Sequence, residues 1–118
     1  MAQAKNSTEV LKAVKWILTN IGWTKGNNYL DTLGKPLDHT GLLSEDLYPK
    51  VGSVCLNGAL NLVEADNATK EISRTLLLSE IDRTTNNHYE TITSFNDRSY
   101  SKEDVLALLD RAIKRSAK

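Results

Sequence analysis

Four segments of this sequence place apolar residues at the spacing of an amphipathic helix, and this repeat constrains the fold more than any other feature. In the first segment, residues 7–21, one stripe consists of Val10, Val14, Ile17, Leu18 and Ile21. Asn6 or Ser7 can accept hydrogen bonds from the free backbone amides at its start. Gly22 can adopt the left-handed conformation that ends a helix. The pattern therefore predicts a helix over residues 7–21.

A second helix is predicted from about Tyr48 to Ala65, with Pro49 tolerated in its first turn. Its wide apolar face consists of Val51, Val54, Cys55, Gly58, Ala59, Leu62 and Val63. A glycine inside a helix costs about 1 kcal/mol relative to alanine, so Gly58 should be compensated by the close approach of a neighbouring backbone. One form of this hypothesis is a homo-oligomer that pairs through Gly58 and Ala59.

The third predicted helix begins near Asp66 or Asn67, either of which can cap it, and ends within residues 84–87. Its apolar positions are Ile72, Leu76, Leu77 and Ile81. Residues 89–95, which follow, are rich in strand formers, but Tyr89, Ile92 and Phe95 also fit a short helical turn. Both structures stay open for that segment.

The fourth predicted helix runs from Lys102 to about Ser116. Its apolar face consists of Val105, Leu108, Leu109, Ala112 and Ile113. Ser101 can cap its start, and Asp104 can complete a short-armed capping box. Basic residues near its end complement the negative pole of the helix dipole, which explains Arg111, Lys114, Arg115 and Lys118 as a solvated face.

Between the first two helices, glycine, proline and asparagine residues interrupt the helical period. Tyr29–Leu30 and Pro36–Leu37 flank the segment Asp31–Lys35, a pattern typical of a small β-hairpin with a glycine turn. Because an isolated hairpin is marginal in water, this one must pack on the helices. The irregular stretch from Trp23 to Pro49 is long for a chain of this size, and such loops often carry function.

These patterns predict a mainly α fold, with about four helices around a single core and a short β-hairpin between helices 1 and 2. The length of 118 residues fits one domain over residues 1–118. Cys55 is the only cysteine, so no disulfide can form within the chain. Fifteen basic and fifteen acidic residues cancel, which disfavours nucleic acid and anionic membranes as partners. The absence of a signal sequence or a spanning segment leads us to expect a cytoplasmic protein.

Three stretches occur together in a distinctive order. They are Gly22–Gly26 followed by Asp31–Leu37, then Cys55–Leu60, then Phe95–Asp97 closed by Glu103–Ala112. Together they resemble a small family of uncharacterised proteins from actinobacteria and their phages, catalogued as a domain of unknown function. The resemblance covers nearly the whole chain. It implies a compact, mainly helical intracellular domain and carries over no established activity.

Asn96 and Asp97 lie in the densest group of chemically capable side chains in the sequence. Both residue types commonly bond to nearby backbone in turns, so we expect them to direct the chain from Phe95 into Ser101. A lone solvated carboxylate with an ordinary pKa of about 3.9 is a poor general base at neutral pH. A structural role is therefore favoured for the pair over a chemical one.

Cys55, together with His39 or His88 and with Asp97, has the residue inventory of a cysteine hydrolase or transferase. However, Cys55 falls on the apolar face inside the predicted second helix, where a buried thiol has a raised pKa and is inert. A cysteine-dependent enzyme is thus the alternative and not the main hypothesis. The cysteine and the two histidines are too scattered for usual zinc spacing, and phosphate-binding glycine motifs do not occur, so we expect no metal and no cofactor.

The function predicted from the sequence is a small cytoplasmic module for protein–protein interaction. Exposed tryptophans often mark contact surfaces, and Trp16 lies off the main stripe of its helix while Trp23 begins the glycine-rich loop. Burial of Trp23 against the hairpin is the favoured alternative. The predicted binding residues are Trp23, Lys25, Tyr29, Asn96 and Asp97. The expected partner is a host or self protein, since the resemblance includes phage proteins, and in that case the compartment is the host cytoplasm.

Overall fold

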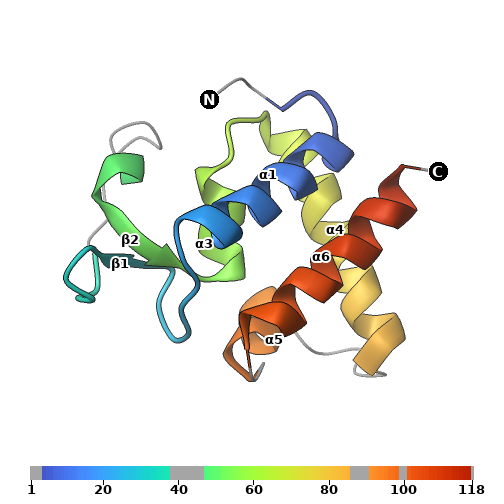
Figure 1. The fold of residues 1–118 in the computed structure, drawn as a ribbon. Helices are drawn as coiled ribbons and strands as arrows, with labels where there is room; N and C mark the ends of the chain where they lie inside the picture. The colour runs from blue at the N-terminus through green and yellow to red at the C-terminus, as the bar shows by residue number, and fades with distance from the viewer. Residues whose placement is uncertain (1–3, 38–46, 86–90, 99–100, 118) are drawn as a thin grey trace.

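The computed structural model describes residues 4–37, 47–85, 91–98 and 101–117. In chain order the elements are α1 (Ser7–Asn20), β1 (Tyr29–Asp31), the 3-10 turn η1 (Tyr48–Lys50), β2 (Val51–Val54), α3 (Leu56–Leu62), α4 (Asn67–Thr85), α5 (Ile92–Arg98) and α6 (Lys102–Ser116). These residues form five α-helices and one two-stranded antiparallel sheet (Figure 1). The prediction of a mainly α fold with a small β element is confirmed, with one helix more than expected. None of the helices in this part of the chain has the length and apolar character needed to cross a membrane.

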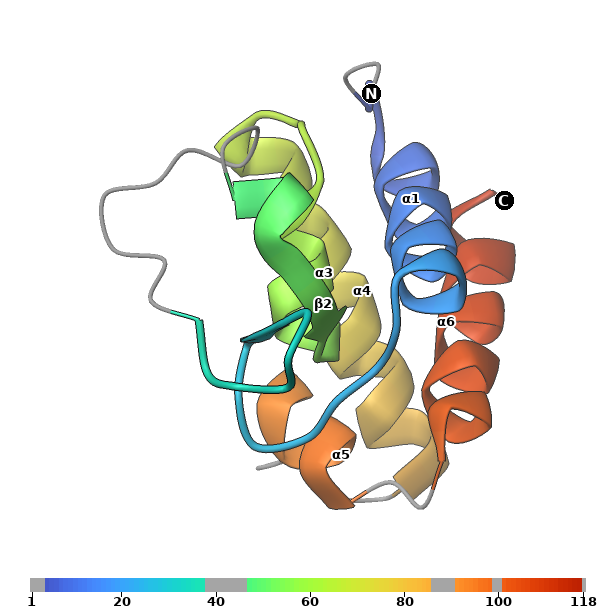
Figure 2. The same ribbon diagram turned by 60° about the vertical axis from the view of Figure 1, so that its left-hand side comes forward.

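Helices α1, α4 and α6 contact one another in pairs, and α1 and α6 lie side by side in both views (Figures 1 and 2). The predicted start of α1 is confirmed, because the side chain of Asn6 accepts a hydrogen bond from the backbone of Glu9 at 2.9 Å. Helix α6 has the predicted bounds, and the carboxylate of Asp104 accepts from the backbone N–H of Ser101 at 3.2 Å. Both helices combine a strong apolar stripe with capping residues, which is why the sequence locates them well.

Helix α4 begins as predicted, since the side chain of Asp66 accepts from the backbone of Thr69 at 2.7 Å. Its inner face differs from the prediction. Leu77 and Ile81 are fully buried, but Ile72 is 56% exposed, and the polar residues Ser73 and Glu80 are buried instead. The apolar spacing therefore predicts the position of this helix in the sequence correctly, but it predicts only part of the face that is buried.

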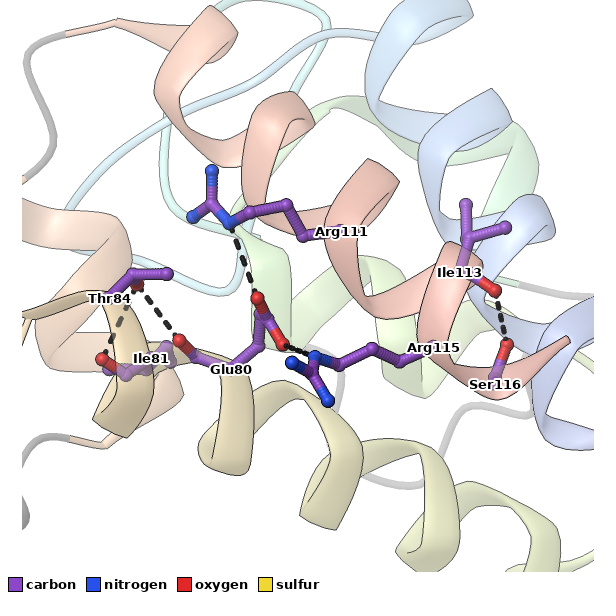
Figure 3. A network of polar contacts seen from close by, with 7 residues as sticks. All are labelled: Glu80, Ile81, Thr84, Arg111, Ile113, Arg115 and Ser116. Atoms are coloured by element: carbon purple, nitrogen blue, oxygen red, sulfur yellow. Dashed lines mark hydrogen bonds and ion pairs between the residues drawn. The ribbon is translucent and has the colours of Figure 1, made fainter. Parts of the chain in front are cut away.

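Glu80 is buried on α4 because two arginines of α6 reach its carboxylate (Figure 3). Nε of Arg111 lies 3.5 Å from Oε1, and Nε of Arg115 lies 2.8 Å from Oε2. A buried carboxylate destabilises a fold unless it is paired. Arg111 and Arg115 are thus not simply a solvated basic face, as expected from the helix dipole, but the partners that allow a glutamate at the contact between α4 and α6.

The largest departure from the sequence prediction lies at residues 48–55, which were expected to begin the second helix. Residues Val51–Val54 form β2, which runs antiparallel to β1 with Tyr29 opposite Val54 and Leu30 opposite Ser53. The helix begins only at Leu56. The spacing of three residues between the two valines fits a helix, since strand side chains alternate with a period of two. However, β-branched residues favour the strand when a partner strand is present. Here the partner supplies the hydrogen bonds that a helix would have formed internally.

The predicted hairpin turn is present, although it is not the main pairing of β1. The backbone N–H of Gly34 donates to the carbonyl of Asp31 at 3.0 Å, and Leu30 and Pro36 form an isolated antiparallel bridge. Gly34 has a φ of 82°, which favours glycine at this position. The sheet therefore combines this short return with the longer pairing to β2.

A second segment approaches β2 from the end of α1. The backbone N–H of Val54 donates to the carbonyl of Gly22, and the N–H of Thr24 donates to the carbonyl of Val54, both at 2.9 Å. Trp23 and Val54 consequently form a parallel bridge. Gly22, with a φ of 142°, makes the turn between α1 and this bridge. These bonds fix where the loop after α1 starts.

Gly58 and Ala59 are buried within the fold, so the hypothesis of a homo-oligomer through their face is wrong. The approaching backbone belongs to the same chain. A Cβ atom on Gly58 would overlap the carbonyl oxygen of Asn28 and lie 3.2 Å from the ring of Tyr29. The expectation that the glycine admits a close backbone contact is confirmed, with residues 28 and 29 as the neighbours.

Candidate functional site

Asn96 is a fully buried residue of α5 that connects three segments distant in sequence. Its Oδ1 accepts hydrogen bonds from the indole Nε1 of Trp23 at 2.6 Å and from the backbone N–H of Leu56 at 3.0 Å. Its Nδ2 donates to the carbonyl oxygen of Thr24 at 3.0 Å. The expected bonding to backbone within a local turn is wrong, because Asn96 lies inside a helix and its three bonds to Trp23, Thr24 and Leu56 are long-range. These hydrogen bonds nevertheless give Asn96 a structural role, which is the role that the sequence favours.

Asp97, the next residue, stabilises the same loop from the surface. Its Oδ1 accepts from the backbone N–H of Gly26 at 2.9 Å and from Nδ2 of Asn96 at 3.2 Å. Gly26 has a φ of 81°, a conformation that residues with a side chain rarely adopt. The pair Asn96 and Asp97 therefore holds the loop of residues 23–28 against α5 at two points.

The outer side of this loop carries an exposed cation close to an aromatic ring. Nζ of Lys25 lies 5.6 Å from the centre of the Trp23 ring, and Trp23 is itself half-buried against the core. The guanidinium of Arg98 similarly lies 5.2 Å from the centre of the Phe95 ring. We call the exposed parts of Trp23, Lys25, Asp97 and Arg98 the loop–α5 surface. Its residues come from two segments about 70 residues apart, which the hydrogen bonds of Trp23 to Asn96 and of Gly26 to Asp97 bring together.

Cys55 is the N-cap residue of α3 and not, as predicted, an interior residue of the helix. Its Sγ accepts from the backbone N–H of Gly58 and donates to Oδ1 of Asn28, both at 3.3 Å. The side chain is 1% exposed, which confirms the expected burial. Burial raises the pKa of the thiol, and this outweighs the backbone N–H groups of Gly58 and Asn57, which lower the pKa. The sulfur therefore stabilises the start of a helix as a protonated thiol.

Tyr29, a predicted binding residue, is buried and lies beside Gly58. Burial raises the pKa of its phenol, and a hydrogen bond with the side chain of Asn61 opposes this shift. It joins β1 to α3 and contributes little to the surface. The structure thus brings Trp23, Lys25 and the Asn96–Asp97 pair together, whereas Tyr29 is buried in β1 against α3.

His39 and His88, proposed as bases in the alternative enzyme, lie outside the described residues. Asp97 acts on Cys55 only by raising the pKa of the thiol, the opposite of activation. Across residues 4–37, 47–85, 91–98 and 101–117, no three side chains of histidine, cysteine, aspartate or glutamate gather as a metal site would require.

Two asparagines of this site were not singled out from the sequence. Oδ1 of Asn28 accepts from Nδ2 of Asn57 at 3.3 Å in addition to the Cys55 thiol. Oδ1 of Asn57 in turn accepts from Nη1 of Arg74 at 2.6 Å. Within the sequence, Asn28 looked only like an interruption of the helical period. The role of its side-chain amide depends on the start of α3, which supplies Cys55 and Asn57, and on α4, which supplies Arg74.

Native Cys55 is expected to resist alkylation by iodoacetamide at pH 8, because the attacking species is the thiolate and this thiol is buried with a raised pKa. Labelling should be complete only after denaturation. Mass spectrometry of the intact chain measures this directly, with glutathione as the control for reagent activity. Rapid labelling of the native protein would contradict the buried position of the sulfur and favour the enzyme hypothesis.

Residues 3–115 match a family model described as "Family of unknown function (DUF6197)". Neither a curated protein nor a solved structure matches the chain. The resemblance to a family of unknown function is confirmed at this level.

Proposed function

We propose that this chain, which belongs to the family of unknown function DUF6197, is a small protein-interaction module that binds its partner through the loop–α5 surface. The main support for this proposal is that an irregular loop is anchored by long-range hydrogen bonds to Asn96 and Asp97. A loop held in one conformation loses less entropy on binding than a mobile one. The anchors thus support a preorganised contact surface.

The chemistry of the surface suggests what the partner presents. Lys25 is exposed beside the half-buried indole of Trp23, and Asp97 has a second carboxylate oxygen beyond the one that bonds Gly26 and Asn96. A partner with an acidic group for Lys25 and an apolar side chain for the indole fits this arrangement. Tryptophan is enriched among residues that dominate binding energy. Tyr29 supports the surface from below by positioning β1.

The proposed partner is a host or self protein in the cytoplasm, and a phage-encoded member would act in the cytoplasm of its host. This part of the proposal rests on the balanced charge of the chain and on the actinobacterial and phage proteins that its motifs resemble. Binding to a protein does not require a large net charge on this chain, whereas binding to nucleic acid or an anionic membrane is favoured by a positive net charge. The cysteine-dependent hydrolase or transferase is less well supported, since the Cys55 thiol is buried and protonated.

Affinity capture with a Lys25→Glu variant tests this function. Reversing the exposed charge should reduce recovery of the specific partner at least about tenfold, because a mismatched charge at the contact typically costs more than 1.4 kcal/mol. Lys35→Glu is the matched control, since Lys35 is also exposed but lies on the hairpin turn. Circular dichroism should show that both variants remain folded. If both variants and the parent chain capture the same proteins equally, the loop–α5 surface is not the contact.

A further inference from the structure

The other tryptophan of the chain lies on α1 and is more exposed than Trp23. Trp16 is 52% exposed on the outer side of α1. It forms part of an open hollow of about 380 Å³ between α1 and α6. The hollow is lined by Lys12, Lys15, Trp16, Thr19, Asn20, Asp110 and Ile113. An exposed indole next to such a hollow is typical of a contact surface.

Among the described residues that line the hollow, Lys12 is a cation without an ion pair. Nζ of Lys15 lies 2.6 Å from Oδ1 of Asp110, so these two residues neutralise each other across α1 and α6. Lys12 is exposed one turn before Trp16, and in the described part of the chain it has no ion-pair partner. The hollow therefore combines an apolar floor of Trp16 and Ile113 with a free positive charge at its edge.

The outer face of α4 has the opposite features. Ile72 is 56% exposed and Leu78 is 37% exposed, on either side of the exposed Thr75. Glu71, next to Ile72, has a side chain that is 69% exposed and pairs only loosely with Arg74, at 3.4 Å. The inner side of α4 contacts α1 and α6, so its outer face points away from the hollow of the same molecule. One chain therefore carries an apolar hollow with a cation and an apolar ridge with an anion, on different sides.

We propose that the hollow between α1 and α6 receives the outer face of α4 from a second copy of this chain. Ile72 of one molecule packs on Trp16 and Ile113 of the next, and Glu71 lies against Lys12. The two surfaces are different, so the contact is head-to-tail and leaves a free hollow on one molecule and a free ridge on the other. Self-association through this contact continues into rings or chains. It uses none of the residues of the loop–α5 surface.

Paired charge reversals test the proposal by sedimentation and by light scattering coupled to size exclusion. The parent chain should gain mass between about 10 μM and 1 mM, the range of a weak to moderate contact. Lys12→Glu damages only the hollow and Glu71→Lys damages only the ridge, so each variant alone should remain monomeric. An equimolar mixture should regain the mass of the parent chain, because the hollow of each variant then meets a ridge of opposite charge on the other variant. The double variant should regain the mass of the parent chain.

One further variant tests the apolar part of the contact, and two others are controls. Trp16→Ala should abolish association while circular dichroism stays unchanged, and Leu33→Ala, at an 80% exposed position on the hairpin turn, should leave association intact. Lys25→Glu should also leave it intact, which separates this contact from the proposed partner surface. A parent chain that is monomeric at about 1 mM overturns the proposal. A mixture of the two charge variants that fails to associate overturns it equally.

Discussion

Gly58→Ala is expected to lower the free energy of unfolding by about 2–3 kcal/mol, although alanine is the better helix former by about 1 kcal/mol. The added Cβ would overlap the carbonyl oxygen of Asn28 and lie 3.0 Å from the carbonyl carbon. That carbonyl cannot move freely, because it accepts a hydrogen bond from the backbone N–H of Cys55 at 3.1 Å. The substitution must therefore push the loop of residues 23–28 away from the start of α3.

Chemical denaturation monitored by circular dichroism measures this loss, and thermal melting should show a decrease of roughly 8–12 °C for a chain of this size. Gly26→Ala is the matched control. Gly26 has a φ of 81° but no atom within 4 Å of an added Cβ, so alanine there should cost only the conformational strain of about 1 kcal/mol. If Gly58→Ala is as stable as the parent chain, α3 and the loop do not pack as described.

The second large effect is expected for Asn96→Leu, which keeps the approximate size of the side chain and removes its polar atoms. The indole N–H of Trp23 and the backbone N–H of Leu56 would lose their acceptor. Each unsatisfied donor in a buried place costs about 1–3 kcal/mol. We expect a total loss of about 3–5 kcal/mol, a substantial part of the stability of an ordinary domain.

Urea denaturation is the measurement, and the tryptophan emission spectrum reports separately on release of the Trp23 indole. Thr93→Leu serves as the control, because Thr93 is an exposed residue of the same helix and should change stability little. Asn96→Asp retains the two acceptor bonds but faces the carbonyl of Thr24 and the carboxylate of Asp97 with a new charge. It should therefore be destabilised at neutral pH and partly recover when the pH falls toward 4. An Asn96→Leu protein with unchanged stability and emission would refute the hydrogen-bond network.

The sequence predicts best those parts of the fold that local interactions determine. Helices α1 and α6 have capping side chains at their starts and one apolar stripe each, so their bounds follow from residues within a few turns. The turn at residues 31–35 is predictable for the same reason, because Gly34 provides the positive φ that it requires. In these segments the local preference and the tertiary fold agree.

Predictions from the sequence are wrong where the local structure depends on residues that are distant in the chain. Val51 and Val54 continue the apolar spacing of α3, and only their pairing with β1, some twenty residues earlier, makes them a strand. Asn96 is a residue type common in turns, yet three of its hydrogen-bond partners are 40 to 73 positions away. The inward position of Glu80 likewise depends on Arg111 and Arg115, which belong to another helix. Periodicity contains no information about such partners.

The hydrogen bonds of Asn96 also have a consequence for the order in which the protein folds. The loop of residues 23–28 is synthesised about 70 residues before its anchors at residues 96 and 97. The hydroxyls of Thr8 and Ser116, 2.7 Å apart, join the start of α1 to the end of α6 in the same way. Contacts of this sequence separation slow folding, because a long stretch of chain must be ordered before they form. A nascent chain that stops before α5 can form α1 and yet has no means to anchor the loop beside it, so this part of the native structure forms only after residues 96 and 97 have been made.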